Sequence, residues 1–385
     1  MVDKLKLLIL LICSFCTAAS AKTFEFSNGS ILDVSGYLGW SQIWLSSGTH
    51  AYNWNEKERG DISSGPEIGA LVSYHINDKI TLFSQVKTGS SLNDILVYSF
   101  ADFHFYDDED WSFSVQGGRL RHDIGLYNQT RVNPRTRLGI IPPQAIYWHS
   151  LRELLTSGTG ISARVKYKNL SISYSVVDPS ITNSKVEAYT WSAGIFDKFD
   201  THFGSQQILA VEYHIIPELR AKFNWLSFNA GNSMSDLGKT FFNVRKEVDQ
   251  FMLGGIEYKK GPFMISGEAI WFKTFDQTWT KGSNLSGPNS KGFSLTTSYD
   301  ITDNLTACLN YNEYDAGYVP PKSPWLHYAK DINAGITYHE DNWQVSVEGH
   351  HINGGRWVSP NEKARDPNAF RNWWIVGVQA VYFFD

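Results

Sequence analysis

The stretch YHEDNWQVSVE, residues 338–348, combines the two patterns that decide the fold. From Trp343 to Glu348 apolar and polar residues alternate, and a period of two predicts a β-strand with one apolar and one polar face. Tyr338 stands on the apolar positions of the preceding segment, just before the short polar turn at 340–342. Aromatic rings with a polar edge are favoured where a membrane meets water. The stretch therefore predicts two antiparallel strands whose turn lies near a membrane surface.

The same arrangement recurs along the chain. Segments 171–176, 219–225 and 293–299 alternate in the same way. A tyrosine or phenylalanine on the apolar positions precedes each of seven short polar turns: Tyr74, Phe105, Tyr167, Tyr213, Tyr258, Tyr299 and Tyr338. In a soluble sandwich such rings would scatter through a core. Rings repeated at one level of a sheet instead indicate a barrel that crosses a bilayer.

Short and long connections alternate, which predicts the strand count. The short turns contain Asp, Asn, Gly or Pro and lie at 77–78, 107–110, 168–169, 216–218, 260–261, 302–304 and 340–342. The longer stretches are 46–61, 88–93, 119–157, 178–205, 229–248, 273–291, 314–330 and 352–370. This asymmetry is typical of outer-membrane barrels, with short periplasmic turns and long outer loops. We predict an all-β, antiparallel up-and-down transmembrane barrel of about 16 strands, within a range of 14–18.

Residues 1–21 have the pattern of a signal peptide rather than of a folded element. Lys4 and Lys6 precede an apolar stretch at 7–15, and Ala19-Ser20-Ala21 resembles a cleavage site. Lipid attachment at Cys16 is the alternative, although Phe15 is bulky for the position before a lipidated cysteine. We expect residues 22–385 to form a single barrel domain.

Composition excludes several classes of protein. After residue 21 no apolar run approaches the roughly 20 residues of a spanning helix. The net charge of −5 comes without a basic stripe, so no nucleic-acid partner is expected. Only Cys308 remains after the signal segment, which excludes an internal disulfide. The histidines show no metal-ligand spacing: His350 and His351 are adjacent and face opposite sides of a strand. We expect neither metal nor cofactor.

The longest connection, 119–157, is the candidate for selectivity. It carries six arginines against Asp123 and Glu153: Arg119, Arg121, Arg131, Arg135, Arg137 and Arg152. Its prolines and apolar residues at 140–147 favour packing against the protein, and long loops in compact folds are commonly functional. Further cations lie on inward-facing strand positions: Arg164, Lys166, Arg220 and Lys222, with Lys168 and Lys259 close by. A narrow wet pore with these charges would favour anions.

A structural role is the alternative for the same arginines. Acidic residues on other strands would then pair with them and pin the loop in place: Asp102, Glu212, Glu257, Glu268, Glu313 and Glu348. All of these except Glu313 are on the positions predicted to face inward. The sequence leaves both interpretations open.

Taken together, the signal segment, chain length, hairpin rhythm, interfacial aromatics and long third loop resemble a Gram-negative general porin. That resemblance covers the whole mature chain. It implies a usually trimeric outer-membrane channel for small hydrophilic solutes, with 119–157 folded into the barrel as the third loop. The sequence departs from the family in two respects. Its third loop is rich in arginine, and Asp385 follows the terminal Phe384.

Two other functions are weighed against the diffusion channel. A sugar-specific channel would need inward-facing aromatic rings, and tryptophans are numerous near strand ends or in loops: Trp148, Trp191, Trp271, Trp279, Trp325, Trp357, Trp373 and Trp374. An outer-membrane lipase would need a serine, a histidine and an acidic or amide partner. No serine stands in a Gly-x-Ser-x-Gly context, so we expect no enzyme.

Overall fold

The computed structural model of the protein describes most of the chain after residue 21. The described residues are 22–46, 53–55, 58–59, 65–89, 96–131, 133–137, 139–147, 157–179, 198–203, 205–236, 239–273, 277–278, 284–285, 289–315, 317, 325, 327–355, 357, 368 and 371–384. The expected signal segment and Arg152 lie outside this part of the chain. No described helix has the length and apolar character needed to cross a membrane.

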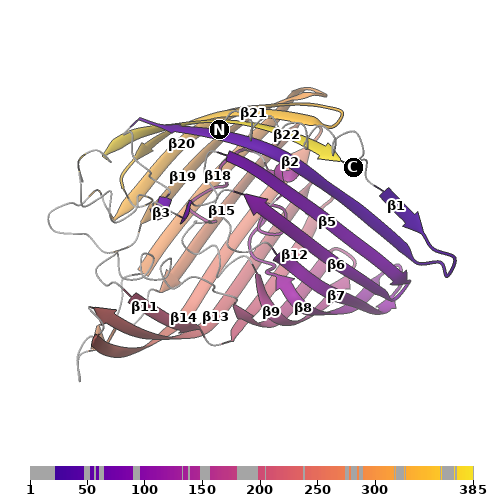
Figure 1. Cartoon of the computed structure of the whole chain (residues 1–385), viewed down its shortest axis with the longest axis horizontal. Helices are drawn as coiled ribbons and strands as arrows, with labels where there is room; N and C mark the ends of the chain where they lie inside the picture. The colour runs from indigo at the N-terminus through magenta and orange to yellow at the C-terminus, as the bar shows by residue number, and fades with distance from the viewer. Residues whose placement is uncertain are drawn as a thin grey trace, which may run out of the picture.

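Sixteen of the described strands form one closed antiparallel barrel (Figure 1). They are β2 (Ile31–Leu45), β5 (Gly65–Asn77), β6 (Ile80–Gly89), β7 (Leu96–Asp107), β8 (Trp111–Arg121), β9 (Ser157–Tyr167), β10 (Leu170–Pro179), β12 (Gln206–Ile216), β13 (Leu219–Asp236), β14 (Lys239–Lys260), β15 (Phe263–Lys273), β18 (Asn289–Thr302), β19 (Leu305–Asp315), β20 (Tyr328–Glu340), β21 (Trp343–Asn353) and β22 (Asn372–Phe384). The barrel closes because Gly36 of β2 pairs with both Ala70 of β5 and Phe384 of β22.

The remaining elements are short additions to this barrel. β1 (Lys22–Glu25) pairs with the start of β2, and β11 (Lys198–Phe203) pairs with the outer part of β13. Two small ladders join β3 (Asn53–Asn55) to β4 (Glu58–Arg59) and β16 (Gln277–Thr278) to β17 (Asn284–Leu285). The predicted up-and-down topology and the count of 16 strands are confirmed.

One predicted long loop is wrong. Residues 229–248 are mostly strand: β13 and β14 stay paired from Leu219↔Tyr258 out to Asp236↔Lys239. The resulting hairpin projects from the loop end of the barrel, at the lower left of Figure 1. Beyond the membrane a hairpin needs no apolar face, because its ladder hydrogen bonds are made within the pair. The loss of alternation in this segment was therefore no sign of a loop.

The outer face of the barrel is apolar and carries the predicted aromatic level. Phe105, Tyr167, Tyr213, Tyr299 and Tyr338 are all exposed near the turns. Additional rings join them on neighbouring strands: Trp111 stacks beside Tyr167 with centroids 4.3 Å apart, and Trp343 lies 5.0 Å from Tyr382. Val345, Val347 and Val376 are exposed on the same outer face. Apolar residues facing outward all around a closed sheet fit a barrel surrounded by lipid.

The interior differs between the two ends of the barrel. At the turn end the inward side chains are polar, as predicted. Towards the loop end, inward residues of several strands are apolar and belong to one buried cluster with the third loop: Val177, Ile208, Leu226, Phe251, Leu253, Ile270, Ile352, Trp373 and Ile375. The expectation that the inward face of each strand is polar is therefore wrong for this half. The loop, rather than water, fills the space there, so apolar side chains are favoured on both faces of the strands.

Candidate functional site: the inward-folded loop and the turn-side cavities

The third loop lies inside the barrel, where its first residues bind the wall of β13 and β15. The Gly125 N–H donates to Asn224 Oδ1 at 2.8 Å, and the Leu126 N–H donates to Glu268 Oε1 at 2.7 Å. Gly125 has φ +62, and a Cβ there would lie 2.5 Å from the Tyr147 hydroxyl oxygen. Glycine is therefore required at the point where the loop turns against the wall.

Two tyrosines extend this contact. The Tyr147 hydroxyl donates to Glu268 Oε1 at 2.8 Å and accepts the Tyr127 N–H at 2.7 Å. The Tyr127 hydroxyl donates to Glu257 Oε2 at 2.8 Å. Burial, reinforced by Glu257 for Tyr127 and by Glu268 for Tyr147, raises the pKa of both phenols. Both hydroxyls therefore remain donors to the wall carboxylates.

A second anchor holds the middle of the loop to β21. The Ile140 N–H donates to Glu348 Oε2 at 2.7 Å, and the Ile141 N–H donates to Glu348 Oε1 at 2.8 Å. His350 Nε2 lies 3.0 Å from Glu348 Oε1, while His350 Nδ1 lies 2.9 Å from Asp331 Oδ2. All three of these wall residues are buried. The Glu348 carboxylate therefore makes three contacts, two with loop amides and one with His350, which Asp331 holds in place from its other side.

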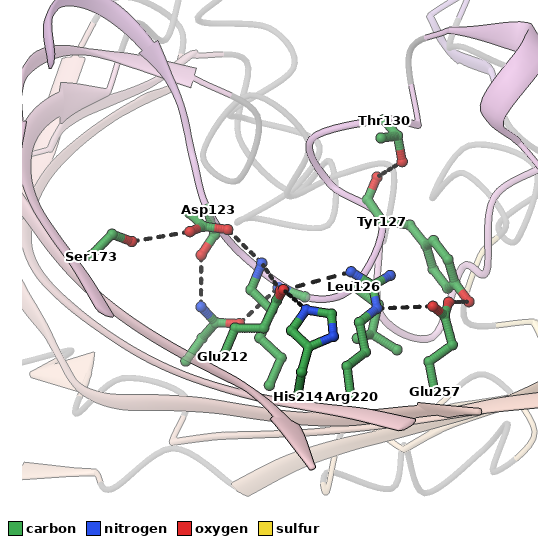
Figure 2. A network of polar contacts seen from close by, with 12 residues as sticks. Asp123, Leu126, Tyr127, Thr130, Ser173, Glu212, His214, Arg220 and Glu257 are labelled. Carbon is green, nitrogen blue, oxygen red and sulfur yellow. Dashed lines mark hydrogen bonds and ion pairs between the residues drawn. The ribbon is translucent and has the colours of Figure 1, made fainter. Parts of the chain in front are cut away.

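Asp123, at the start of the loop, is bound by cations of β9 and β13 and by Ser173, which Figure 2 shows beside it. Lys222 Nζ donates to Asp123 Oδ1, the Ser173 hydroxyl donates to Oδ2 at 3.0 Å, and Arg164 Nη2 lies 3.8 Å from Oδ2. Burial opposes ionisation of this carboxyl, but Lys222 and Arg164 outweigh it and lower its pKa. The loop therefore begins at an ion pair with the wall.

Beside Asp123, the wall cations are matched by wall acids (Figure 2). Arg220 Nε donates to Glu257 Oε1 at 2.8 Å, and Arg220 Nη1 lies 3.7 Å from Glu212 Oε2. Lys222 Nζ is 3.8 Å from the same Glu212 oxygen, and His214 Nε2 is 3.3 Å from Glu212 Oε1. Arg220 and Lys222 therefore face the interior, as predicted, but each is paired with a carboxylate.

The arginines flanking the loop make contacts with protein groups. Arg119 Nε donates to the Ser157 hydroxyl at 3.3 Å. Arg121 Nε donates to the Asn128 carbonyl at 2.8 Å, and its Nη1 donates to Gln85 Oε1 at 3.3 Å. These contacts tie the end of β8 to the loop and to β6.

The three arginines within the described loop differ in position. Arg131 is buried and its Nη1 donates to the Tyr147 carbonyl at 3.4 Å. The guanidinium of Arg135 lies 4.4 Å from the centre of the Phe383 ring, a cation–π geometry. Arg137 Nη2 donates to Gln379 Oε1 at 3.3 Å. Loop and wall are thus joined by arginine contacts on the β22 side.

The acids expected to pair with the loop arginines have other partners, and three of them hold the loop through its backbone or a tyrosine. Glu268 and Glu348 accept backbone N–H groups of the loop, and Glu257 accepts a phenol. Asp102 accepts from the Gln116 amide at 2.9 Å. Glu313 lies on the outer face and pairs with Lys330 at 3.0 Å. Backbone donors are the same for every residue type, so the sequence contained no signal for these anchors.

Two cavities open inside the barrel on the turn side of the loop, and both border Tyr127 and Thr136. The first, here called the basic cavity, has a volume of about 780 Å³. Five basic residues line it (Arg164, Lys166, Lys168, Arg220 and Lys222) with two acids (Asp123 and Glu212), an excess of three positive charges.

The second, the balanced cavity, has a volume of about 550 Å³. Arg135, Arg137 and Lys259 line it with the acids Glu257, Asp300 and Asp341, so its charges cancel. The loop therefore separates two spaces of different charge. Four of the predicted site residues line the basic cavity: Arg164, Lys166, Arg220 and Lys222. Two others, Arg135 and Arg137, line the balanced cavity.

Trp148, Trp191 and Trp279 lie outside the described residues, and the other tryptophans and histidines discussed above are dispersed. Trp357 and Trp373 are buried in the apolar cluster, and Trp374 is exposed on the outer face beside His351, with rings 4.5 Å apart. His350 is buried on the opposite side of the strand, as predicted. Within the described ranges, no three His, Cys, Asp or Glu side chains are placed to hold a metal ion.

Comparison with known proteins bears on the fold. No protein-family model and no curated protein matches the sequence. Several solved structures match, including OmpF of Salmonella typhi in complex with daunomycin, at 11% identity and a TM-score of 0.57 over 94% of this chain and 100% of that one. The anion-selective porin from Comamonas acidovorans is 12% identical, with a TM-score of 0.55 over 92% and 100%. OmpT, an outer membrane protein of Vibrio cholerae (trimer form), is 12% identical, with a TM-score of 0.55 over 92% and 99%.

At such low identities the likeness establishes the architecture. The chain has the 16-stranded barrel fold of bacterial outer-membrane porins. The outer-membrane location expected from the signal pattern and the aromatic level agrees with that fold.

Proposed function

We propose that the protein is an outer-membrane porin, a water-filled channel for passive diffusion and ion transport of small hydrophilic solutes. One observation carries this proposal. The barrel is apolar outside, and its turn half contains cavities of about 780 and 550 Å³ with polar walls beside the third loop. A polar interior within a lipid-facing barrel is the arrangement of porins. The tilted 16-stranded barrel is also wide enough to leave an aqueous channel.

We further propose that the channel prefers anions. The basic cavity has an excess of three positive charges, whereas the balanced cavity has none. Two unit charges 4 Å apart interact by about 1 kcal/mol in water and about 4 kcal/mol at an effective dielectric constant of 20. A wall with a net excess of positive charge therefore raises the local concentration of anions and lowers that of cations. Arg119, Arg121, Arg131 and Arg152 are proposed to contribute to the same field from the loop.

The proposed partners follow from the fold. Outer-membrane lipid surrounds the barrel, and small hydrophilic or anionic solutes pass through it. We propose a homotrimer, as the porin resemblance implies, and the similar OmpT structure is itself described as a trimer form. Residues 1–21 are proposed to be a cleaved signal peptide.

The channel and its selectivity are tested by reconstituting the purified protein in a planar bilayer. We expect stepwise increases of conductance, and a reversal potential of the sign for anion preference in a gradient of potassium chloride. Chloride and potassium have similar mobility in water, so the sign reports the pore charge. A bilayer that stays silent would contradict the channel, and a potential of cation sign would contradict only the preference.

A further inference from the structure

The wall of the basic cavity has a gap between β9 and β12. In the turn-side part of β9 the inward side chains are Arg164 and Lys166, and Lys168 follows in the turn. On the next strand, β10, the paired inward residues are only serines: Lys166 pairs with Ser171, and Arg164 pairs with Ser173. Ser171 pairs in turn with Glu212 of β12. Small side chains on β10 therefore leave open space between a cationic strand and the Glu212 network.

The two sides of this gap differ in charge compensation. Towards β12 and β13, Arg220 and Lys222 have Glu257, Glu212 and Asp123 as partners. On the β9 side, Arg164 reaches Asp123 only at 3.8 Å, and Lys222 already binds that carboxylate.

Lys166 of β9 and Lys168 of the following turn are compensated even less than Arg164. Lys168 lies 3.7 Å from Asp110, with both side chains 55% exposed. A pair so exposed is weak. Lys166 is exposed, and no carboxylate of the described chain lies within ion-pair distance of it. Positive charge that is unpaired or only weakly paired is thus concentrated at Lys166 and its neighbours Arg164 and Lys168.

We propose that this gap, bounded by Arg164, Lys166, Lys168 and Ser171, binds small solutes that carry two or more negative charges on oxygen. Phosphate esters and dicarboxylates share this chemistry. The proposal rests on the proposed channel function, since solutes reach the gap through the lumen. It adds to that function a saturable site on the wall.

The chemistry of the gap favours multivalent anions over chloride. Arginine and lysine bind oxyanions through charge-assisted hydrogen bonds, and the arginine fork matches two oxygens at once. Ser171, which also lines the cavity, supplies a hydroxyl donor between the cations and Glu212. A dianion neutralises two cations together, whereas chloride neutralises one and has no oxygens to accept paired hydrogen bonds.

The test measures the chloride current of reconstituted channels while inorganic pyrophosphate is added, with succinate as a second probe. Wild type is compared with Lys166→Gln and with the matched control Lys291→Gln. Lys291 is an exposed lysine on β18, at an outward position two residues from Phe293. Loss of one charge-assisted contact is expected to raise the half-blocking pyrophosphate concentration about tenfold. The control should leave that concentration unchanged.

The outcomes separate this site from the channel itself. Saturable block that weakens in Lys166→Gln alone supports the site, and the response to succinate shows whether dicarboxylates share it with phosphates. If pyrophosphate does not block open channels, or blocks wild type and Lys166→Gln equally, the proposed site is wrong. The proposed channel function would be unaffected by that result. Protein that inserts and carries no chloride current overturns the channel as well.

Discussion

Replacing Glu348 by leucine is expected to lower the free energy of unfolding by about 3–5 kcal/mol, the usual cost of removing one partner from a buried charged network. Leucine has a similar size but accepts no hydrogen bonds. The Ile140 and Ile141 N–H groups would lose their acceptor, and His350 would keep only Asp331. Because the middle of the loop would lose its anchor, we also expect larger and noisier single-channel currents.

The control for this change is Glu313→Leu, the same substitution on the outer face. Glu313 pairs with Lys330 at 3.0 Å, and both side chains are more than 40% exposed. Exposed pairs of this kind contribute about 0–1 kcal/mol. Unfolding in detergent, followed by gel mobility, and single-channel recording measure the two effects. Equal stability of the two variants, together with wild-type currents from Glu348→Leu, would show that the carboxylate does not hold the loop.

Replacing Lys166 and Lys168 together by glutamate is expected to reverse the ion selectivity. The basic cavity has five basic and two acidic residues; the double change leaves three basic and four acidic, so its charge goes from +3 to −1. The field in the cavity then attracts cations instead of anions. The reversal potential in a salt gradient should change sign. Lys291→Glu adds negative charge on the outer face and leaves the cavity unaltered, so the reversal potential should stay unchanged.

An unchanged reversal potential in the double variant would show that Lys166 and Lys168 do not set the ion selectivity. The arginines of the loop would then be the remaining source of positive charge. Arg135 and Arg137 line the balanced cavity, so their substitution would be the next comparison.

The barrel was predictable from sequence because its signals are local. The alternation from Trp343 to Glu348 and the turn before it predict the β20–β21 hairpin. The same two signals recur along the chain and predict a barrel of about sixteen strands, as observed. Where the signals are not local, prediction failed. The β13–β14 hairpin stays paired out to Asp236↔Lys239 although the sequence does not alternate there. Strand alternation places Leu226 and Ile375 inward, but their apolar character there reflects the apolar loop residues in the same cluster, which no pattern within their own strands indicates.

The site was predictable only in part, for the same reason. The inward positions of Arg164, Lys166, Arg220 and Lys222 follow from strand parity. Strand alternation does not predict the ion-pair partners of these cations, because Asp123 and Lys222 are 99 residues apart in the sequence. The anchors at Glu268 and Glu348 were named only as arginine partners. Their actual donors are mainly backbone amides, whose identity depends on the loop conformation and not on residue type.

If the channel runs through the barrel interior beside the third loop, a cysteine at Thr136, introduced in a Cys308→Ser background, should face the current path. Thr136 is exposed on the loop and borders both cavities. A bulky charged thiol reagent should reduce the current of open channels at this position, and should leave it unchanged for Val347→Cys, whose side chain is exposed on the outer face. Full modification of Thr136→Cys with an undiminished current would contradict the account.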